Sequence, residues 1–198
     1  MIKSINRDEI IFAILLSVLP VLLVVILSMF VMLTSAGKNE VIQTAIVLIS
    51  SFVIVPYILI KKNYGMDLRE LGVSFENKFE ILVELFVILI FAVCIKYIVN
   101  PPTYLSLVGS TLFVAVCEEF WARGCLFYIF GRIFNNKVIV LLISTFIFVF
   151  VVHVNRGIVE NALYRLPGAL IMGLIYWRTG KLQYSIGFHF IYNILGSI

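Results

Sequence analysis

Long apolar runs, separated by short polar segments, extend over almost the whole chain. Seven of these runs reach or approach the roughly 20 residues that a helix needs to cross the hydrocarbon core of a bilayer. We therefore expect an all-α protein, a polytopic transmembrane helix bundle of about seven spans. The predicted spans are Ile10–Leu33, Val41–Ile60, Ile81–Val99, Thr103–Phe130, Val138–Val154, Ile158–Trp177 and Leu182–Ile198.

The composition points to lipid as the main solvent. Of the 198 residues, 62% are hydrophobic and 13% are charged, whereas soluble domains have about 45–50% apolar and about 25% charged residues. No repeat or change of composition divides the chain, so we expect residues 1–198 to form a single integral membrane domain. The net charge of +4 is scattered, and no basic run is interleaved with aromatic residues, so nucleic acid is not an expected partner.

The positions of Lys and Arg favour one orientation. With the N-terminus in the cytoplasm, ten basic residues lie in cytoplasmic segments and three lie on the outer side, which is a strong positive-inside bias. We therefore expect an integral protein of a prokaryotic plasma membrane with a cytoplasmic N-terminus. The ten are Lys3, Arg7, Lys61, Lys62, Arg69, Lys78, Arg132, Lys137, Arg178 and Lys181, and the three are Lys38, Lys96 and Arg156.

Adjacent glutamates, Glu118 and Glu119, stand in the middle of the fourth apolar run. Carboxylates at bilayer depth are costly, so such a pair is kept only where it is satisfied or used. Glu119 and Arg123 are four residues apart and can pair on one helix face. Glu118 points about 100° away from that face and has no such partner. The pattern predicts a structural role for Glu119 and leaves Glu118 available for chemistry.

Both histidines of the chain also lie within predicted spans. His153 follows the apolar run Phe146–Val152, while His189 and Asn193 are four residues apart on one helix face. Taken singly, such groups serve as interhelical hydrogen bonds. Counted by helix rise, Glu118 and His189 both lie roughly 10 Å from the cytoplasmic edge of the membrane. By the same count from Val138, His153 lies roughly 20 Å from that edge, so its depth does not agree with theirs. We therefore expect Glu118 and His189 to lie at one depth near the cytoplasmic face and the polar set to converge within the bundle.

Two chemistries fit this set of side chains. A glutamate can act as general base on water while neutral donors stabilise an oxyanion. Alternatively, Glu118, His153 and His189 are candidate ligands of a divalent metal such as zinc, which would bind the attacking water. Both chemistries hydrolyse amides. The sequence contains neither H-E-x-x-H nor G-x-S-x-G, the signatures of zincin metalloproteases and of α/β-hydrolase nucleophiles.

The same residues resemble the three motifs of the CPBP family of CAAX-protease and bacteriocin-processing intramembrane proteases, also called the Abi family. The first motif, E-E-x-x-x-R, matches Glu118, Glu119 and Arg123, and the third, H-x-x-x-N, matches His189 and Asn193. The second, F-x-x-x-H, matches only at His153. The position four residues earlier is Val149, with Phe148 and Phe150 on either side. The motif-bearing half is about residues 103–198.

The resemblance implies an α-helical membrane endopeptidase that hydrolyses a peptide bond of a membrane-associated peptide or protein. By this resemblance, Glu118 would activate the attacking water with help from His153. His189 and Asn193 would bind the oxyanion, and Glu119 with Arg123 would hold the site together. The family is often labelled a metalloprotease, but a metal-free glutamate mechanism fits these residues equally well. Membrane lipid and a peptide or membrane-tethered protein are the implied partners.

Two other interpretations are weighed against a protease. The first is a non-enzymatic membrane protein, such as a factor for bacteriocin self-immunity or for regulation of a sensor kinase. The second is a small proton-coupled carrier, because intramembrane Glu, His and Arg also mark ion paths. The pair of helices broken by Gly or Pro that many transporters contain is not evident, which counts against a carrier.

Overall fold

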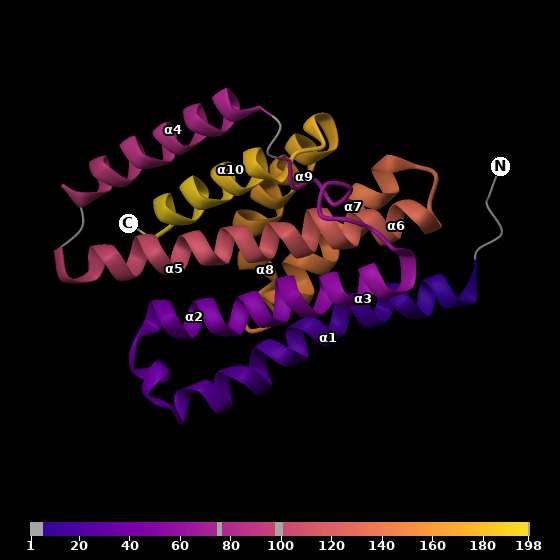
Figure 1. Cartoon of the computed structure of the whole chain (residues 1–198), viewed down its shortest axis with the longest axis horizontal. Coiled ribbons are helices and arrows are strands. Elements are labelled where there is room, and N and C mark those ends of the chain that lie inside the picture. Colours follow the sequence, from indigo (N-terminus) through magenta and orange to yellow (C-terminus); the bar gives the residue numbers. More distant parts are fainter. Residues whose placement is uncertain (1–5, 75–76, 98–100, 198) are drawn as a thin grey trace.

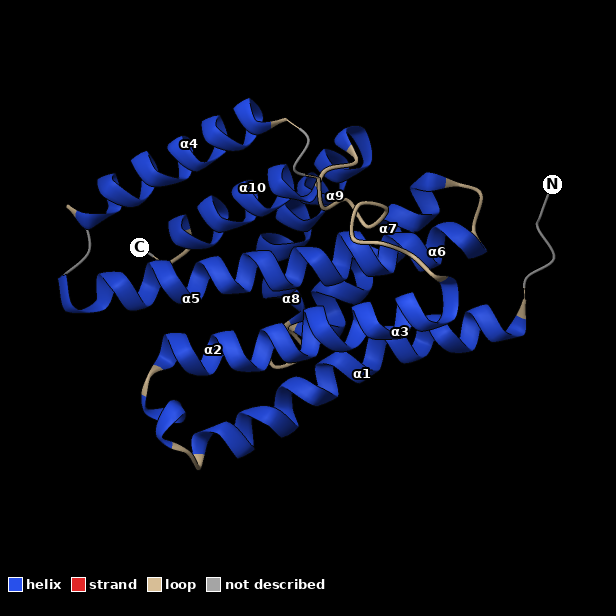
Figure 2. Cartoon of the chain, in the orientation of Figure 1, coloured by secondary structure: helices blue, strands red, loops and turns tan. Residues whose placement is uncertain are grey.

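The computed structural model describes residues 6–74, 77–97 and 101–197, and this part of the chain forms helices without any strand (Figures 1 and 2). Seven continuous helices follow one another at the positions predicted from the apolar runs. Four of them contain a π-helical segment, labelled η. The helices are α1 (Arg7–Met32), α2–η2–α3 (Glu40–Leu48, Ile49–Ile54, Val55–Tyr64), α4 (Lys78–Lys96), α5–η3–α6 (Pro101–Glu119, Phe120–Leu126, Phe127–Ile133), α7–η4 (Lys137–Ile147, Phe148–Val152), α8–η5–α9 (Ile158–Glu160, Asn161–Arg165, Leu166–Thr179) and α10 (Leu182–Leu195).

Three of these helices are long and apolar enough to cross a membrane, namely Arg7–Met32, Glu40–Tyr64 and Ile158–Thr179. Lys137–Val152 is apolar but shorter. Helix α10 has 14 residues, which is about 21 Å of helix against a core of about 30 Å. The expectation of about seven spans therefore stays a prediction, whereas apolar membrane helices are present.

The outer surfaces of α1 and α4 carry large apolar side chains that no other part of the described chain covers. On each helix these side chains recur along the outward face, so the exposure is continuous rather than scattered. Such a surface is stable in contact with lipid and unstable in contact with water. Among these residues are Leu22, Met29, Phe30, Phe79, Leu82, Phe86 and Leu89.

Asparagine side chains start four of the helices. Each accepts a hydrogen bond from a backbone N–H of the first turn, which satisfies a donor that would otherwise lack a partner. Gly180 ends α9 in the left-handed conformation, with a φ of 67°, and this conformation is accessible to glycine without strain. The turns between apolar runs are therefore encoded locally. The N-capping residues are Asn6, Asn39, Asn77 and Asn136.

The segment η3 forms the centre of the bundle. All seven of its residues are buried, and the indole Nε1 of Trp121 donates a hydrogen bond of 2.9 Å to the carbonyl of Leu16 on α1. Helices α9 and α10 approach closely at Gly168. A Cβ there would lie 2.8 Å from the ring of Tyr192, so this crossing requires glycine. The close packing brings α5, α9 and α10 together around the polar residues described below.

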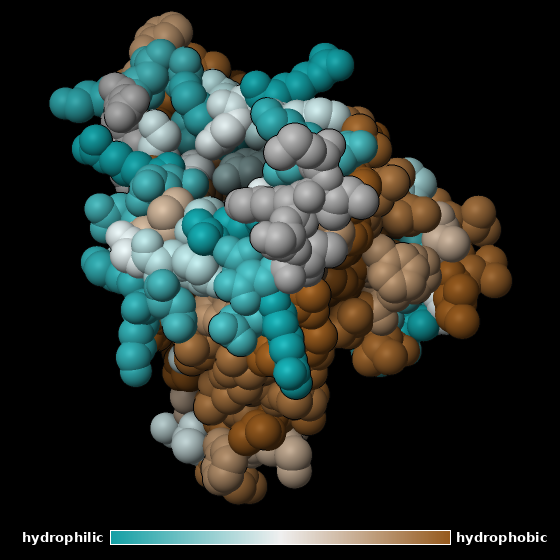
Figure 3. Space-filling view, turned by 90° about the vertical axis from the view of Figure 1, so that its right-hand side faces the viewer, coloured by the Kyte–Doolittle hydropathy of each residue, from teal (hydrophilic) through white to brown (hydrophobic). Residues whose placement is uncertain are grey.

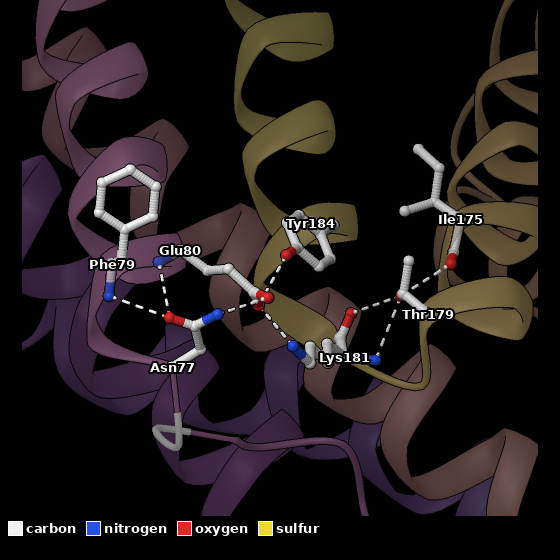
Figure 4. A network of polar contacts seen from close by, with 7 residues as sticks. All are labelled: Asn77, Phe79, Glu80, Ile175, Thr179, Lys181 and Tyr184. Atoms are coloured by element: carbon white, nitrogen blue, oxygen red, sulfur yellow. Dashed lines mark hydrogen bonds and ion pairs between the residues drawn. The ribbon is translucent and has the colours of Figure 1, made fainter.

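A polar network ties the start of α4 to the turn between α9 and α10 (Figure 4). Asn77 caps α4 and donates from Nδ2 to Glu80 at 2.8 Å. The other oxygen of Glu80 accepts hydrogen bonds from Lys181 and from the hydroxyl of Tyr184, the latter at 2.8 Å. Because Lys181 and Tyr184 belong to the start of α10, this network holds two neighbouring helices together at one end of the bundle.

Candidate active site

The two glutamates lie at the end of α5, where the helix continues into η3. Glu118 is 6% exposed and Glu119 is fully buried. Glu119 turns toward Arg123, whereas Glu118 lines a cavity. The two neighbours thus face different surroundings, as expected from the angle of about 100° between successive residues of a helix.

Glu119 and Arg123 form a buried ion pair. Arg123 Nη1 lies 2.9 Å from Glu119 Oε1, and the two side chains are 1% and 0% exposed. The Nη2 atom of Arg123 donates to the carbonyl of Ala169 on α9 at 2.7 Å, and the guanidinium lies 4.7 Å from the ring centre of Phe148 on η4. One arginine therefore binds α5, α9 and the α7–η4 helix to each other.

His189 on α10 lies between the two glutamates. Its Nδ1 is 2.9 Å from Glu119 Oε1, and its Nε2 is 3.7 Å from Glu118 Oε2. We assign a proton to Nδ1, because the ionised carboxylate of Glu119 can only accept. This bond orients the ring and leaves Nε2 directed at Glu118. The distance of 3.7 Å is too long for a direct hydrogen bond, so the contact needs a bridging group such as water.

Phe148 contacts both histidine rings. Its ring centre lies 5.6 Å from that of His153 and 5.9 Å from that of His189, both with edge-to-face geometry. Phe148 stands five residues before His153, not four, and the residues between them form the π-helical segment η4. A π-helix repeats its hydrogen bonds at i to i+5, so residues five apart share a face. The departure from the F-x-x-x-H spacing is thereby explained by one additional residue in the helical turn.

The loop after His153 is held by a side chain that the sequence did not mark. Asn161 is 2% exposed, and its Nδ2 donates to the backbone carbonyl of His153 at 2.9 Å. Arg165, one turn further on, donates to Glu160 at 2.7 Å. Asn161 is not among the predicted site residues, because a single asparagine in a polar stretch has no distinguishing pattern.

One cavity of about 920 Å³ joins the predicted site residues. Its wall includes Glu118, His153, His189 and Asn193, which come from α5, the η4–α8 connection and α10. Glu119 and Arg123 lie behind this wall. The structure therefore brings the residues predicted to act on a substrate to one cavity, whereas the pair predicted to be structural does not line that cavity and contacts it through His189.

The predicted metal ligands do not form a metal-binding set. Among the described residues, no three His, Cys, Asp or Glu side chains are placed so that they could hold one metal ion. Of the candidate ligands, His189 uses Nδ1 for Glu119 and presents Nε2 toward Glu118, while the ring of His153 packs on Phe148.

The fold and the site define a class of protein: a bundle of apolar helices that buries glutamate, histidine and arginine side chains around an internal cavity. Residues 100–195 match the family model described as Type II CAAX prenyl endopeptidase Rce1-like. The match confirms the predicted resemblance over this part of the chain. No curated protein and no solved structure matches the chain. The family implies protease activity and a place in a membrane.

Proposed function

We propose that the protein is an intramembrane endopeptidase in which Glu118 activates a water molecule. The observation that supports this proposal most directly is the placement of Glu118 on the cavity wall, 3.7 Å from His189 Nε2. A water molecule bonded to both atoms would be oriented on two sides. The general-base role requires a carboxylate within reach of the water proton, and Glu118 is the carboxylate here that the ion pair with Arg123 does not occupy.

The proposed reaction accounts for every proton and every bond without a metal ion. Glu118 removes a proton from the water, and the hydroxide oxygen adds to the carbonyl carbon of the scissile peptide bond. Asn193 and His153 face the same cavity and supply donors to the oxyanion that develops. This exchanges the roles that the resemblance implied for the two histidines, because His189 Nε2 is the imidazole nitrogen beside Glu118. The C–N bond then breaks, and the proton held by Glu118 passes to the departing amine nitrogen. His189 orients Glu118 and the water, and Glu119 with Arg123 fixes His189.

The setting of this reaction is part of the proposal. We infer about seven spans, a cytoplasmic N-terminus and the plasma membrane of a prokaryote. The basic residues at one end of the bundle and the apolar surfaces of α1 and α4 support this inference. The substrate would be a peptide or protein that is itself held at the membrane, because the cavity lies inside a bundle whose sides face lipid.

The test compares Glu118→Gln with a matched control. Glu84→Gln removes another half-buried carboxylate, one on α4 that does not line the large cavity. Each variant is reconstituted in detergent-opened vesicles with a farnesylated peptide or with an unlipidated transmembrane peptide, and new termini are detected by mass spectrometry. We expect cleavage to fall by about 10²–10⁴ for Glu118→Gln and to persist for Glu84→Gln. Equal cleavage by both variants would refute the proposal.

Metal dependence is tested on the same preparation. The proposed steps predict that cleavage survives dialysis against a chelator and that metal analysis of the active protein finds less than one metal ion per chain. Loss of cleavage on chelation, restored by zinc, would show that the water is activated by a metal instead.

A further inference from the structure

Most basic residues of the described chain lie at one end of the bundle. The starts of α1, α4, α7 and α10 and the ends of α3, α6 and α9 are directed toward this end (Figure 1), and the ion pair between Arg132 on α6 and Glu9 on α1 joins two of them. Figure 3 looks at this end and shows hydrophilic residues gathered over it. Among the described residues, this end carries Arg7, Lys61, Lys62, Arg69, Lys78, Arg132, Lys137, Arg178 and Lys181.

The opposite end carries far fewer basic residues. It is formed by the starts of α2 and α5 and the end of α10 (Figure 1), and the hydrogen bond of 2.5 Å from Ser106 on α5 to Glu40 on α2 joins two of these helices. Lys38 and Lys96 are its basic residues within the described ranges, and Arg156 lies in the loop that joins η4 to α8. By the positive-inside rule the basic end lies in the cytoplasm, and this end lies outside.

The cavity opens at the end that is poor in basic residues. From Glu118 its wall follows α5 back through Val114, Thr111 and Ser110. Its exposed rim combines residues of the helix ends on that side with residues of the loop before α8 and of α8–η5. Helix rise gives about 12 Å from Glu118 to Ser110. The exposed or half-exposed rim residues are Glu40, Arg156, Glu160, Tyr164, Gly196 and Ser197.

Toward the basic end the same cavity is closed. The helix that carries Glu118 continues into η3, where all residues from Phe120 to Leu126 are buried. Trp121 is fully buried there and is fixed to α1 by its indole N–H. A substrate from the cytoplasm would have to pass this packed segment. A substrate from the other side meets a polar rim with charged residues of both signs.

We propose that this site acts on peptide segments presented at the outer face of the membrane. The inference rests on the proposed protease function and on the cytoplasmic N-terminus. The sequence predicted a site near the cytoplasmic face. That prediction came from the depth of each residue along its helix, which does not tell from which side of the membrane the site is reached. The substrate class is a peptide or protein whose scissile segment is exposed outside the cytoplasm, with enough polar character to enter a hydrated mouth.

Cysteine labelling tests the direction of access in intact cells. Cys94 is exposed, whereas Cys117 and Cys125 are buried, so Cys94→Ser gives a background without a reactive thiol. In that background, Ser197→Cys reports on the rim, Thr111→Cys on the cavity wall and Lys62→Cys on the basic end. The probes are a membrane-impermeant maleimide and, for the narrow cavity, a small sulfonated methanethiosulfonate.

We expect Ser197→Cys and Thr111→Cys to react in intact cells and Lys62→Cys to react only after permeabilisation. The reverse pattern, or labelling of Lys62→Cys and Ser197→Cys from the same side, overturns the inference. Failure of Thr111→Cys to react from outside while Ser197→Cys reacts overturns it as well, because the cavity would then be closed on that side.

Cysteine labelling does not depend on catalysis. The protease proposal is tested by the Glu118→Gln comparison in opened vesicles, and the direction of access is tested by labelling. A chain that labels as expected but cleaves nothing refutes the function alone. A chain that cleaves peptides in opened vesicles but labels in the reverse pattern refutes only the direction of access.

Discussion

Removal of Arg123 provides a quantitative test of how the site is held together. The substitution Arg123→Met keeps an unbranched side chain of similar length in a place that is 1% exposed. It deletes the ion pair to Glu119 at 2.9 Å, the hydrogen bond to the Ala169 carbonyl at 2.7 Å and the stacking on Phe148 at 4.7 Å. Glu119 is then left fully buried with His189 as its remaining partner.

The expected loss follows from these contacts. A charged hydrogen bond contributes about 1.5–3 kcal/mol, and a desolvated cation–π contact contributes about 2 kcal/mol, but burying the guanidinium costs several kcal/mol. Breaking one partner of a buried pair leaves an uncompensated charge, which costs about 3–5 kcal/mol. We therefore expect Arg123→Met to lower the free energy of unfolding by about 3–5 kcal/mol.

A double-mutant cycle separates the pair from its surroundings. Glu119→Gln removes the charge but retains an oxygen that can accept from His189, and the double variant removes both charges at once. Because the double variant leaves no isolated buried charge, we expect it to cost about 2 kcal/mol less than the sum of the single variants, within the range measured for residues in contact. Unfolding by sodium dodecyl sulfate in mixed micelles measures all four free energies. Additive losses, or a loss below about 1 kcal/mol for Arg123→Met alone, would refute this account of the pair.

Three further outcomes follow from the packing and from the pKa of one surface carboxylate. Phe148→Leu removes the ring that contacts both histidines, so we expect peptide cleavage to fall by at least tenfold, while Phe150→Leu, whose ring contacts Phe146, retains activity in the same vesicle assay. Deleting Val151 from η4 converts the π-helical turn into an α-helical turn and keeps Phe148 on the same helix face as the histidine that follows. We therefore expect this variant to fold and to cleave peptide. Deleting Leu142 from the regular helix α7 should abolish cleavage. Hydrogen bonds from Lys181 and Tyr184 at the start of α10 lower the pKa of Glu80. The ionised Glu80 therefore stabilises the fold at pH values above the ordinary glutamate pKa. This stabilisation is lost as the pH falls through the lowered pKa of the folded protein. Unfolding midpoints of wild type and Glu80→Gln should differ at neutral pH and converge in acid, and a difference that grows in acid would contradict the argument.

Much of the fold can be predicted from the sequence because lipid imposes a simple requirement on the backbone. Backbone groups in the membrane must be bonded within a helix, so each apolar run longer than about 15 residues is helical, and the asparagines before α1, α2, α4 and α7 mark where helices begin. The spacing of Glu119 and Arg123 also predicts their contact, because a pair four residues apart on a helix depends on no other element.

Contacts between different helices are harder to predict from the sequence. His189 and Asn193 share a helix face, as their spacing indicates, but nothing in the sequence shows that Nδ1 of His189 binds Glu119. That bond depends on how α10 crosses α5. The role of Asn161 likewise depends on the loop that returns to His153. Hydropathy also does not show at which end of a bundle an internal cavity opens. The sequence therefore predicted a site near the cytoplasmic face, whereas the cavity opens toward the opposite end.

The π-helical turns explain why residue spacing alone predicts this site incompletely. Such turns are rare, contain one more residue than an α-helical turn, and occur frequently at functional sites. Within the described chain, η3 follows the glutamate pair and contains Arg123, η4 precedes His153, and η5 contains Asn161. Each of the three inserts a residue next to a side chain of the site. A regular helix with the same residues would rotate the following side chain by about 100°, so the irregular turn η4 is what allows Phe148 and His153, five residues apart, to contact each other.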